Sequence, residues 1–206
     1  MEVEVKFRLP NKSSHQKLLS VLSPFYITTR YQHNEFLDGS AYELSSQQAV
    51  LLLRLYEQTS IPECIVCLKA KPVLANGVSC IEMEYEDLDP AIFKACLDDP
   101  QRLMQVDLRV VRRVVRRVEE EFGVKRFVGL GGFRNVRKVH KWKGVKLDVD
   151  EAKYEFGEMY EVECETSEPE RVKKMLEEFF KENGIDYSYS VMSKFAVFRA
   201  GKLPPS

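Results

Sequence analysis

The first nine residues place two carboxylates and two cations at alternate positions. If they form a strand, side chains alternate between its two faces. One face then carries Glu2, Glu4, Lys6 and Arg8. Two acidic side chains about 6.6 Å apart on one face can converge on a hard divalent ion, and the cations beyond them can hold an anion. Taken alone, the same pattern also fits the solvated face of an edge strand.

Length and composition limit the folds and functions that this 206-residue chain can have. It is long enough for one large domain, and 44% apolar residues can build a core. Lys plus Arg (31) nearly equals Asp plus Glu (32), which argues against general nucleic-acid binding. No apolar run reaches membrane-spanning length, and the N-terminal residues do not have the pattern of a secretory signal.

Five cysteines, an odd number, predict reduced thiols and a cytoplasmic location. Cys64 and Cys67 form a C-x-x-C, but it lies in a strand-like run where positions three apart face opposite ways. No second pair follows, so these cysteines are not expected to bind a metal.

The apolar patterns predict an α+β order of elements. Strands are expected at residues 1–9, 25–38 (two strands), 50–57, 64–71, 78–86, 127–139, 140–149, 159–166 and 191–199. Helices are expected at residues 12–22, 90–97, 103–122 and 169–183. Ser167 or Glu168 is expected to cap the last of these helices, with a capping box at Ser167 and Glu170. Most strands adjoin in sequence, which favours antiparallel pairing.

The helix at 103–122 carries a basic stripe beside its apolar valines. The stripe consists of Arg109, Arg112, Arg113, Arg116 and Arg117. A nucleic-acid or membrane contact is one interpretation. A solvated face with acidic partners nearby, such as Glu119 to Glu121, is the more usual one.

The strands share one apolar and one charged face, and the helices need a surface to cover. If helices cover the apolar faces, the charged faces are either solvated or enclosed. Three glutamates in a row at 82, 84 and 86 would repel one another on an open sheet. A closed barrel with a charged interior explains the pattern, and small barrels can hold one small ligand. Paired charges of both signs suit a polyanion together with a divalent metal.

The same residues resemble the signature of the CYTH superfamily, the triphosphate tunnel metalloenzymes. The resemblance begins with E-x-E-x-K at Glu2, Glu4 and Lys6 and continues in order over nearly the whole chain. It includes Arg54, the L-K-A-K run to Lys71, Glu82 and Glu84, Asn-Val-Arg at Arg137, K-L-D-V-D from Lys146, E-V-E to Glu163, and Ser-Lys-Phe from Ser193. The chain is most similar to the plant short-form members.

The resemblance implies a single domain over residues 1–206, built as an eight-stranded antiparallel closed β-barrel with helices outside. It implies an inorganic triphosphatase that converts tripolyphosphate and water to pyrophosphate and phosphate with Mg²⁺ or Mn²⁺. A monomer that binds neither nucleic acid nor membrane is expected.

Residue roles follow from matching positions in the family. The implied metal ligands are Glu2, Glu4, Asp148, Glu161 and Glu163. Catalytic roles are implied for Glu2, Glu4, Lys6 and Asp148. The implied substrate-binding cations are Lys6, Arg8, Arg54, Lys69, Lys71, Arg137, Lys146 and Lys194. One departure is Leu52, where relatives often have the first arginine of Arg-x-Arg.

Other functions remain open from the sequence. The same fold can act on thiamine triphosphate or a nucleotide, or can cyclise ATP. A non-catalytic polyphosphate-binding module is a further alternative, and the plainest is an α+β scaffold whose charges are solvated.

Overall fold

The computed structural model describes residues 1–57, 63–105 and 112–205. Its strands are β1 (Glu2–Leu9), β2 (Tyr26–Gly39), β3 (Ala49–Tyr56), β4 (Glu63–Ala75), β5 (Val78–Asp87), β6 (Phe127–Trp142), β7 (Val145–Tyr154), β8 (Gly157–Glu165) and β9 (Ser188–Tyr189). Their hydrogen-bonded order is β5-β4-β3-β2-β6-β7-β8-β1-β9. A further pairing of β5 with β1 closes the eight longer strands into a β-barrel, as the sequence predicted.

The helices lie between these strands in the chain, except that the last helix follows β9. They are α1 (Lys12–Leu22), α2 (Pro90–Asp98), α3 (Arg112–Phe122), α4 (Pro169–Glu182) and α5 (Lys194–Ala200). Short 3-10 turns add η1 (Ser23–Phe25), η2 (Ser45–Gln47) and η3 (Pro100–Gln105). Within the described residues, no helix is both long and apolar enough to span a membrane.

The chain divides into two compact units by its internal contacts. The first comprises Met1 with residues 31–72 and 81–133. The second comprises residues 2–30, 73–80 and 134–206. A single domain over the whole chain stays a prediction.

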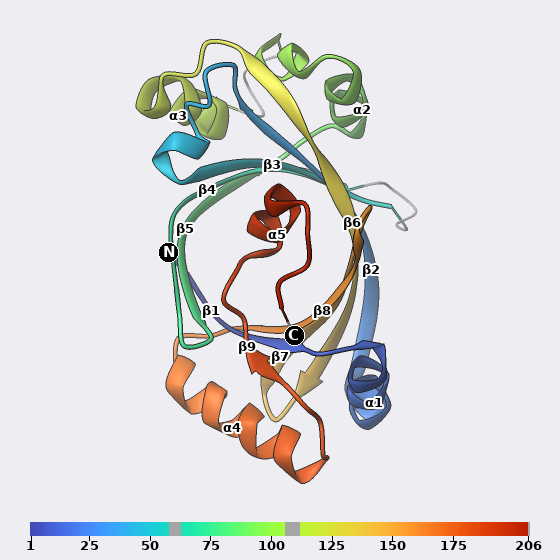
Figure 1. Ribbon diagram of the computed structural model, residues 1–206. Helices are drawn as coiled ribbons and strands as arrows, with labels where there is room; N and C mark the ends of the chain where they lie inside the picture. Colours follow the sequence, from blue (N-terminus) through green and yellow to red (C-terminus); the bar gives the residue numbers. More distant parts are fainter. Residues whose placement is uncertain (58–62, 106–111, 206) are drawn as a thin grey trace. The chain divides into compact units, whose positions relative to one another are not determined.

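In the second unit, β1 sorts its side chains as the alternation predicted. Val5, Phe7 and Leu9 are buried in one apolar core with α1 and α4. The ring of Phe7 meets Phe180 of α4 edge-on at 5.2 Å between centroids. In Figure 1, α1 and α4 lie on one side of β1, β7 and β8, and α5 lies on the other. The opposite face of β1 is thereby left to its charged residues.

The first unit has its own apolar core. Leu51 and Leu53 of β3 and Val66 of β4 pack there with Phe93 of α2 and Val114 of α3. Residues 52 and 54 of β3 therefore point to the other face of the sheet, because neighbouring side chains alternate.

The expected helix at 103–122 is wrong at its beginning. Leu103 to Gln105 belong to η3, and α3 begins at Arg112. The expected Val106, Arg109, Val110 and Val111 lie outside the described residues, as does the side chain of Arg112.

The described part of the basic stripe has acidic partners on two elements. Arg116 and Arg117 pair with Glu120 and Glu121 at 2.8 and 2.9 Å, so the predicted acidic partners are confirmed. Arg117 also reaches Glu82 of β5 at 3.1 Å. The glutamate row of β5 therefore has counter-charges on α3, and its repulsion is no reason for the barrel to close.

At the end of the row, Glu86 caps α3. Its carboxylate accepts hydrogen bonds from the backbone N–H groups of Arg113 and Val114, at 3.1 and 3.0 Å. An acidic side chain at a helix N-terminus satisfies free N–H groups and favours the helix dipole. The sequence reasoning missed this role of β5.

The expected last strand at 191–199 is also wrong, since α5 occupies Lys194–Ala200. Ser193 caps this helix by accepting a hydrogen bond from the N–H of Ala196 at 3.1 Å, and Gly201 ends it with a positive φ. Only Val197 of α5 is fully buried, so the apolar alternation that suggested a strand carries little packing.

The predicted capping box of α4 does not form. Glu168 is the N-cap, without a side-chain capping bond, and its own N–H donates to Thr166 Oγ1 at 3.0 Å. Pro169 in the first turn needs no partner for its missing N–H, which reduces the demand for a cap.

The core between β1 and α4 yields a stability prediction. Phe180→Ala should lower the free energy of unfolding by about 3–5 kcal/mol, because it removes a fully buried ring and leaves a cavity. Phe25→Ala, at a position 40% exposed, is the matched control and should cost less than about 1 kcal/mol. Urea denaturation measures both, and equal losses would show that the α4 core is not packed as described.

Candidate active site

The charged face of β1, β7 and β8 is a buried cluster of ion pairs. Antiparallel register places Lys6 opposite Glu163, and Arg8 opposite Glu161. On the other side of β8, Asp148 lies opposite Glu163 and Asp150 opposite Glu161. Directly opposite residues share a face, so three neighbouring strands bring both signs of charge together.

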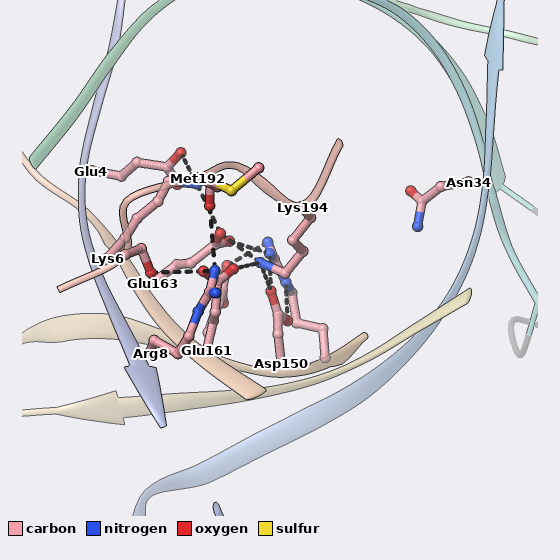
Figure 2. A network of polar contacts seen from close by, with 12 residues as sticks. Glu4, Lys6, Arg8, Asn34, Asp150, Glu161, Glu163, Met192 and Lys194 are labelled. Atoms are coloured by element: carbon pink, nitrogen blue, oxygen red, sulfur yellow. Dashed lines mark hydrogen bonds and ion pairs between the residues drawn. The ribbon is translucent and has the colours of Figure 1, made fainter. Parts of the chain in front are cut away.

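Three cations each bridge several carboxylates. Lys6 Nζ lies 2.7 Å from Glu4 and 2.8 Å from Glu163. Lys194 Nζ, at the start of α5, lies 2.9 Å from both Asp150 and Glu161 and 2.6 Å from Glu163. Figure 2 shows these side chains converging from separate elements.

Arg137 of β6 is the third bridging cation. It donates to Asp148 at 2.8 Å, to Asp150 at 2.8 and 2.6 Å, and to Glu163 at 2.5 Å. Its planar fork suits such multidentate pairing better than a lysine would.

At the far end of β1, Arg8 and Ser190 share one carboxylate. Arg8 Nη2 and Ser190 Oγ donate to Glu161 Oε1 at 3.3 and 2.7 Å. Arg8 Nε is buried and has no hydrogen-bond partner among the described residues. Arg8 is therefore held weakly enough to engage another acceptor.

Burial and ion pairing act in opposite directions on these groups. Burial by itself would raise the pKa of the Glu163 carboxyl, but Lys194, Lys6 and Arg137 hold that pKa well below its ordinary value. Asp150 is likewise buried, and Arg137 and Lys194 lower its pKa. Burial also opposes the charged form of Lys6, yet Glu163 and Glu4 raise its pKa. Glu163, Asp150 and Lys6 therefore stay ionised at neutral pH.

The carboxylate oxygens are suitable ligands for a hard divalent ion, because such ions take oxygen ligands. Asp148 Oδ1 is buried and accepts no hydrogen bond from the described residues. Among the described residues, however, no three His, Cys, Asp or Glu side chains are grouped closely enough to hold a metal ion. Lys6, Arg137 and Lys194 stand between the carboxylates instead. A metal would need Lys6 or Lys194 to release a carboxylate first.

Most of the residues expected from the sequence meet in this cluster. They are Glu4, Lys6, Arg8, Arg137, Asp148, Glu161, Glu163 and Lys194. Lys146, half-exposed, lies 3.4 Å from Asp148. Glu2 is half-buried at the beginning of β1.

The sequence reasoning missed two members of the cluster. Asp150 is fully buried and binds both Arg137 and Lys194. Its alternation with Asp148 in β7 was the available signal. Ser190 gave no signal, because nothing local distinguishes it from an exposed serine.

The remaining predicted cations belong to the first unit. Arg54 Nε donates to Asn34 Oδ1 at 2.7 Å, and Asn34 Nδ2 donates to the Phe133 carbonyl at 3.3 Å. Asn34 is 1% exposed, so it orients the guanidinium. Lys69 is half-buried on the same sheet face as Arg54.

Lys71 and Leu52 differ from that arrangement. Lys71 has a 72% exposed side chain and a positive φ, and it pairs with Glu82 at 2.9 Å. Its substrate role stays a prediction. Leu52 is buried between Phe36 and Cys67 on the neighbouring strands, so apolar packing replaces the arginine common in relatives.

A closed antiparallel barrel whose sheet is lined on one face by paired carboxylates and cations defines the class of this protein. Its family is CYTH, because the CYTH domain model matches residues 1–195. The predicted family is therefore confirmed. The metal dependence of this family supports a metal-dependent site.

Solved structures agree with this assignment. The Hippeastrum protein HpAC1 is 48% identical and superposes with a TM-score of 0.94, with 100% of this chain and 98% of that chain covered. Its description names an adenylyl cyclase candidate with a dominant triphosphatase activity. An adenylate cyclase candidate from Bacillus halodurans is 20% identical, with a TM-score of 0.68 and 97% and 96% coverage, and it shares the fold. No curated protein sequence matches the chain.

The ion pairs predict how one variant depends on pH. Arg137→Gln should lower the free energy of unfolding at pH 7 by about 3–5 kcal/mol, because it leaves buried carboxylates uncompensated. Arg137 helps to depress the folded pKa of Asp150 and Glu163 against their burial. Its contribution is therefore present above the unfolded carboxyl pKa, about 4.5 for Glu163, and is lost as the pH falls through the depressed values.

Denaturation at pH 7 and at pH 4 tests this linkage. The cost of Arg137→Gln should shrink at the lower pH. Arg171→Gln removes an exposed pair with Glu168 and should cost at most about 1 kcal/mol at both. A cost of Arg137→Gln that does not change with pH would contradict the described pairing.

Proposed function

We propose that this chain is a metal-dependent triphosphatase that hydrolyses inorganic tripolyphosphate to pyrophosphate and phosphate. The observation that carries the proposal is the buried cluster in which Lys6, Arg137 and Lys194 interleave with carboxylates. The 48% identity to HpAC1, with its triphosphatase activity, supports the reaction class.

The cations of the cluster bind the phosphates. Each already lies within hydrogen-bond distance of acidic oxygens, so phosphate oxygens can take over contacts of the same geometry. Arg8 has a free Nε, and Arg137 offers a bidentate fork. These charges stabilise the loose transition state of phosphoryl transfer, where charge is spread over the equatorial oxygens.

The carboxylates hold the metal and position water. Glu2, Glu4, Asp148, Glu161 and Glu163 are the proposed ligands, and Mg²⁺ or Mn²⁺ suits their oxygens. Held by these carboxylates, a divalent ion would supply charge neutralisation for the phosphates and a more acidic bound water. Asp148 Oδ1 is free to accept a hydrogen bond from the attacking water. The water oxygen bonds to the terminal phosphorus as the anhydride bond breaks.

Substrate specificity is the finer part of the proposal. Tripolyphosphate is favoured because the cluster presents several closely spaced cations, which match the repeated charge of a phosphate chain. Thiamine triphosphate, nucleotides and ATP cyclisation are the competing outcomes. The free thiols of all five cysteines support a reducing, cytosolic environment, and the protein is proposed to act as a monomer without nucleic-acid or membrane partners.

A phosphate-release screen tests the reaction and its metal dependence together. Tripolyphosphate, pyrophosphate, ATP and thiamine triphosphate are compared with Mg²⁺, Mn²⁺ and EDTA, and cyclic AMP is measured with ATP. Metal-dependent release is expected to be fastest from tripolyphosphate. No release from any substrate would refute the enzyme assignment, and tight tripolyphosphate binding would then indicate a binding module.

Glu4→Gln should lower turnover by roughly 100-fold, because it removes a proposed metal ligand without changing side-chain size. Glu170→Gln, on the exposed face of α4, is the matched control and should not change turnover. Unchanged activity of Glu4→Gln would contradict the ligand role.

Lys69→Ala should raise KM about tenfold, the loss of one charged hydrogen bond to phosphate. Lys94→Ala, at an exposed position of α2, is the control. Circular dichroism should show both variants folded. Loss of folding in Lys69→Ala would make the lysine structural instead.

A further inference from the structure

Two lysines face each other directly at the end of the β6–β7 hairpin. Lys141 of β6 is the register partner of Lys146 of β7. The pairs that follow are Val139 with Asp148 and Arg137 with Asp150. Because Lys146, Asp148 and Asp150 alternate along β7, all of these residues share the charged face of the cluster. Lys141 therefore extends the row of cations, and the sequence reasoning did not single it out.

A pair of lysines at directly opposite positions is unfavourable in a β-sheet. Side chains directly opposite have Cβ atoms about 4.5–5.5 Å apart, and like charges there destabilise the sheet. Lys141 is exposed and makes no ion pair or hydrogen bond with the described residues. Lys146 contacts Asp148 only at 3.4 Å, on an oxygen that Arg137 already binds at 2.8 Å. Such uncompensated local conflicts are typical of functional positions.

The spacing along the strand sets what the pair can bind. Lys141 is four residues beyond Arg137, about 13 Å along β6. A small anion seated among Arg137, Lys6 and Lys194 would not reach both ends of this row. A linear chain of phosphates has the length and the repeated charge to do so.

We propose that Lys141, together with Lys146, forms an outer anion subsite that holds the end of a linear polyphosphate chain while its other end occupies the central cluster. The subsite rests on the proposed function and extends it, since it makes binding depend on the number of phosphates. Chains of three or more phosphates are the substrate class that uses it.

The hairpin supplies a matched control. Lys143 is two residues from Lys141, is exposed and carries the same charge. Its Nζ lies 4.8 Å from the centroid of the Trp142 ring, and Trp142 packs on Phe179 of α4 in the apolar core. Lys143 therefore serves the face of the sheet away from the cluster.

The experiment compares wild type, Lys141→Gln and Lys143→Gln. KM and turnover are measured for tripolyphosphate with Mg²⁺, and dissociation constants for tripolyphosphate and pyrophosphate are measured by calorimetry with EDTA. Lys141→Gln should raise KM about three- to tenfold at low ionic strength with turnover unchanged, and higher salt should reduce the difference. Its loss of affinity should be larger for tripolyphosphate than for pyrophosphate. Lys143→Gln should match wild type in every measurement.

The outcomes separate this subsite from the proposed function. If Lys141→Gln and Lys143→Gln raise KM equally, the effect comes from the general electrostatic field of the protein. If Lys141→Gln weakens tripolyphosphate and pyrophosphate binding equally, binding does not depend on chain length. Either result, or an unchanged Lys141→Gln, overturns the subsite while wild-type hydrolysis keeps the proposed function. If wild type binds tripolyphosphate without hydrolysing it, the dissociation constants alone decide the subsite. If wild type does neither, both proposals fall.

Discussion

The compensation of buried charge is the constraint on which this structure depends. Asp150 and Glu161 are at most 1% exposed, and an isolated carboxylate so buried would be prohibitively costly. Each is held by a cation from a different element, so no strand can carry its charged face without the others. The apolar residues on the opposite faces only decide which way each strand is turned. The requirement for counter-charges decides which strands must meet.

The same constraint shapes the chemistry. Glu4, Asp148, Glu161 and Glu163 are each engaged by a lysine or an arginine, so these charges already hold one another. Under the proposed function, a metal and a polyanion that bind together would replace internal contacts with external ones of the same kind. Binding is then an exchange of partners in which little net charge is buried. Lys194 is central to the exchange, because it contacts three carboxylates and begins the short helix α5.

Much of the charged face followed from the sequence, for reasons that are local. Period-two alternation placed Glu4, Lys6 and Arg8 on one side of β1, and the structure agrees. The sequence predictions that failed concern elements whose structure depends on residues far away in the chain. The helix at Lys194 is favoured by a serine cap and by carboxylates 31 to 44 residues earlier in the chain, neither of which changes the apolar pattern. Glu86 looked like one member of a repulsive row, because its role as a cap exists only once α3 is docked.

The pairing of β1 with β8 also has a consequence for how the protein is made. Lys6 and Glu163 are partners across 157 positions in the sequence. During synthesis the first strand emerges long before its counter-charges, with Val5, Phe7 and Leu9 still uncovered. Contacts so distant in sequence form slowly, because a long loop must first be closed. The nascent chain therefore carries this strand unpaired until β8 and α5 have been made, and the charged cluster comes together only after that.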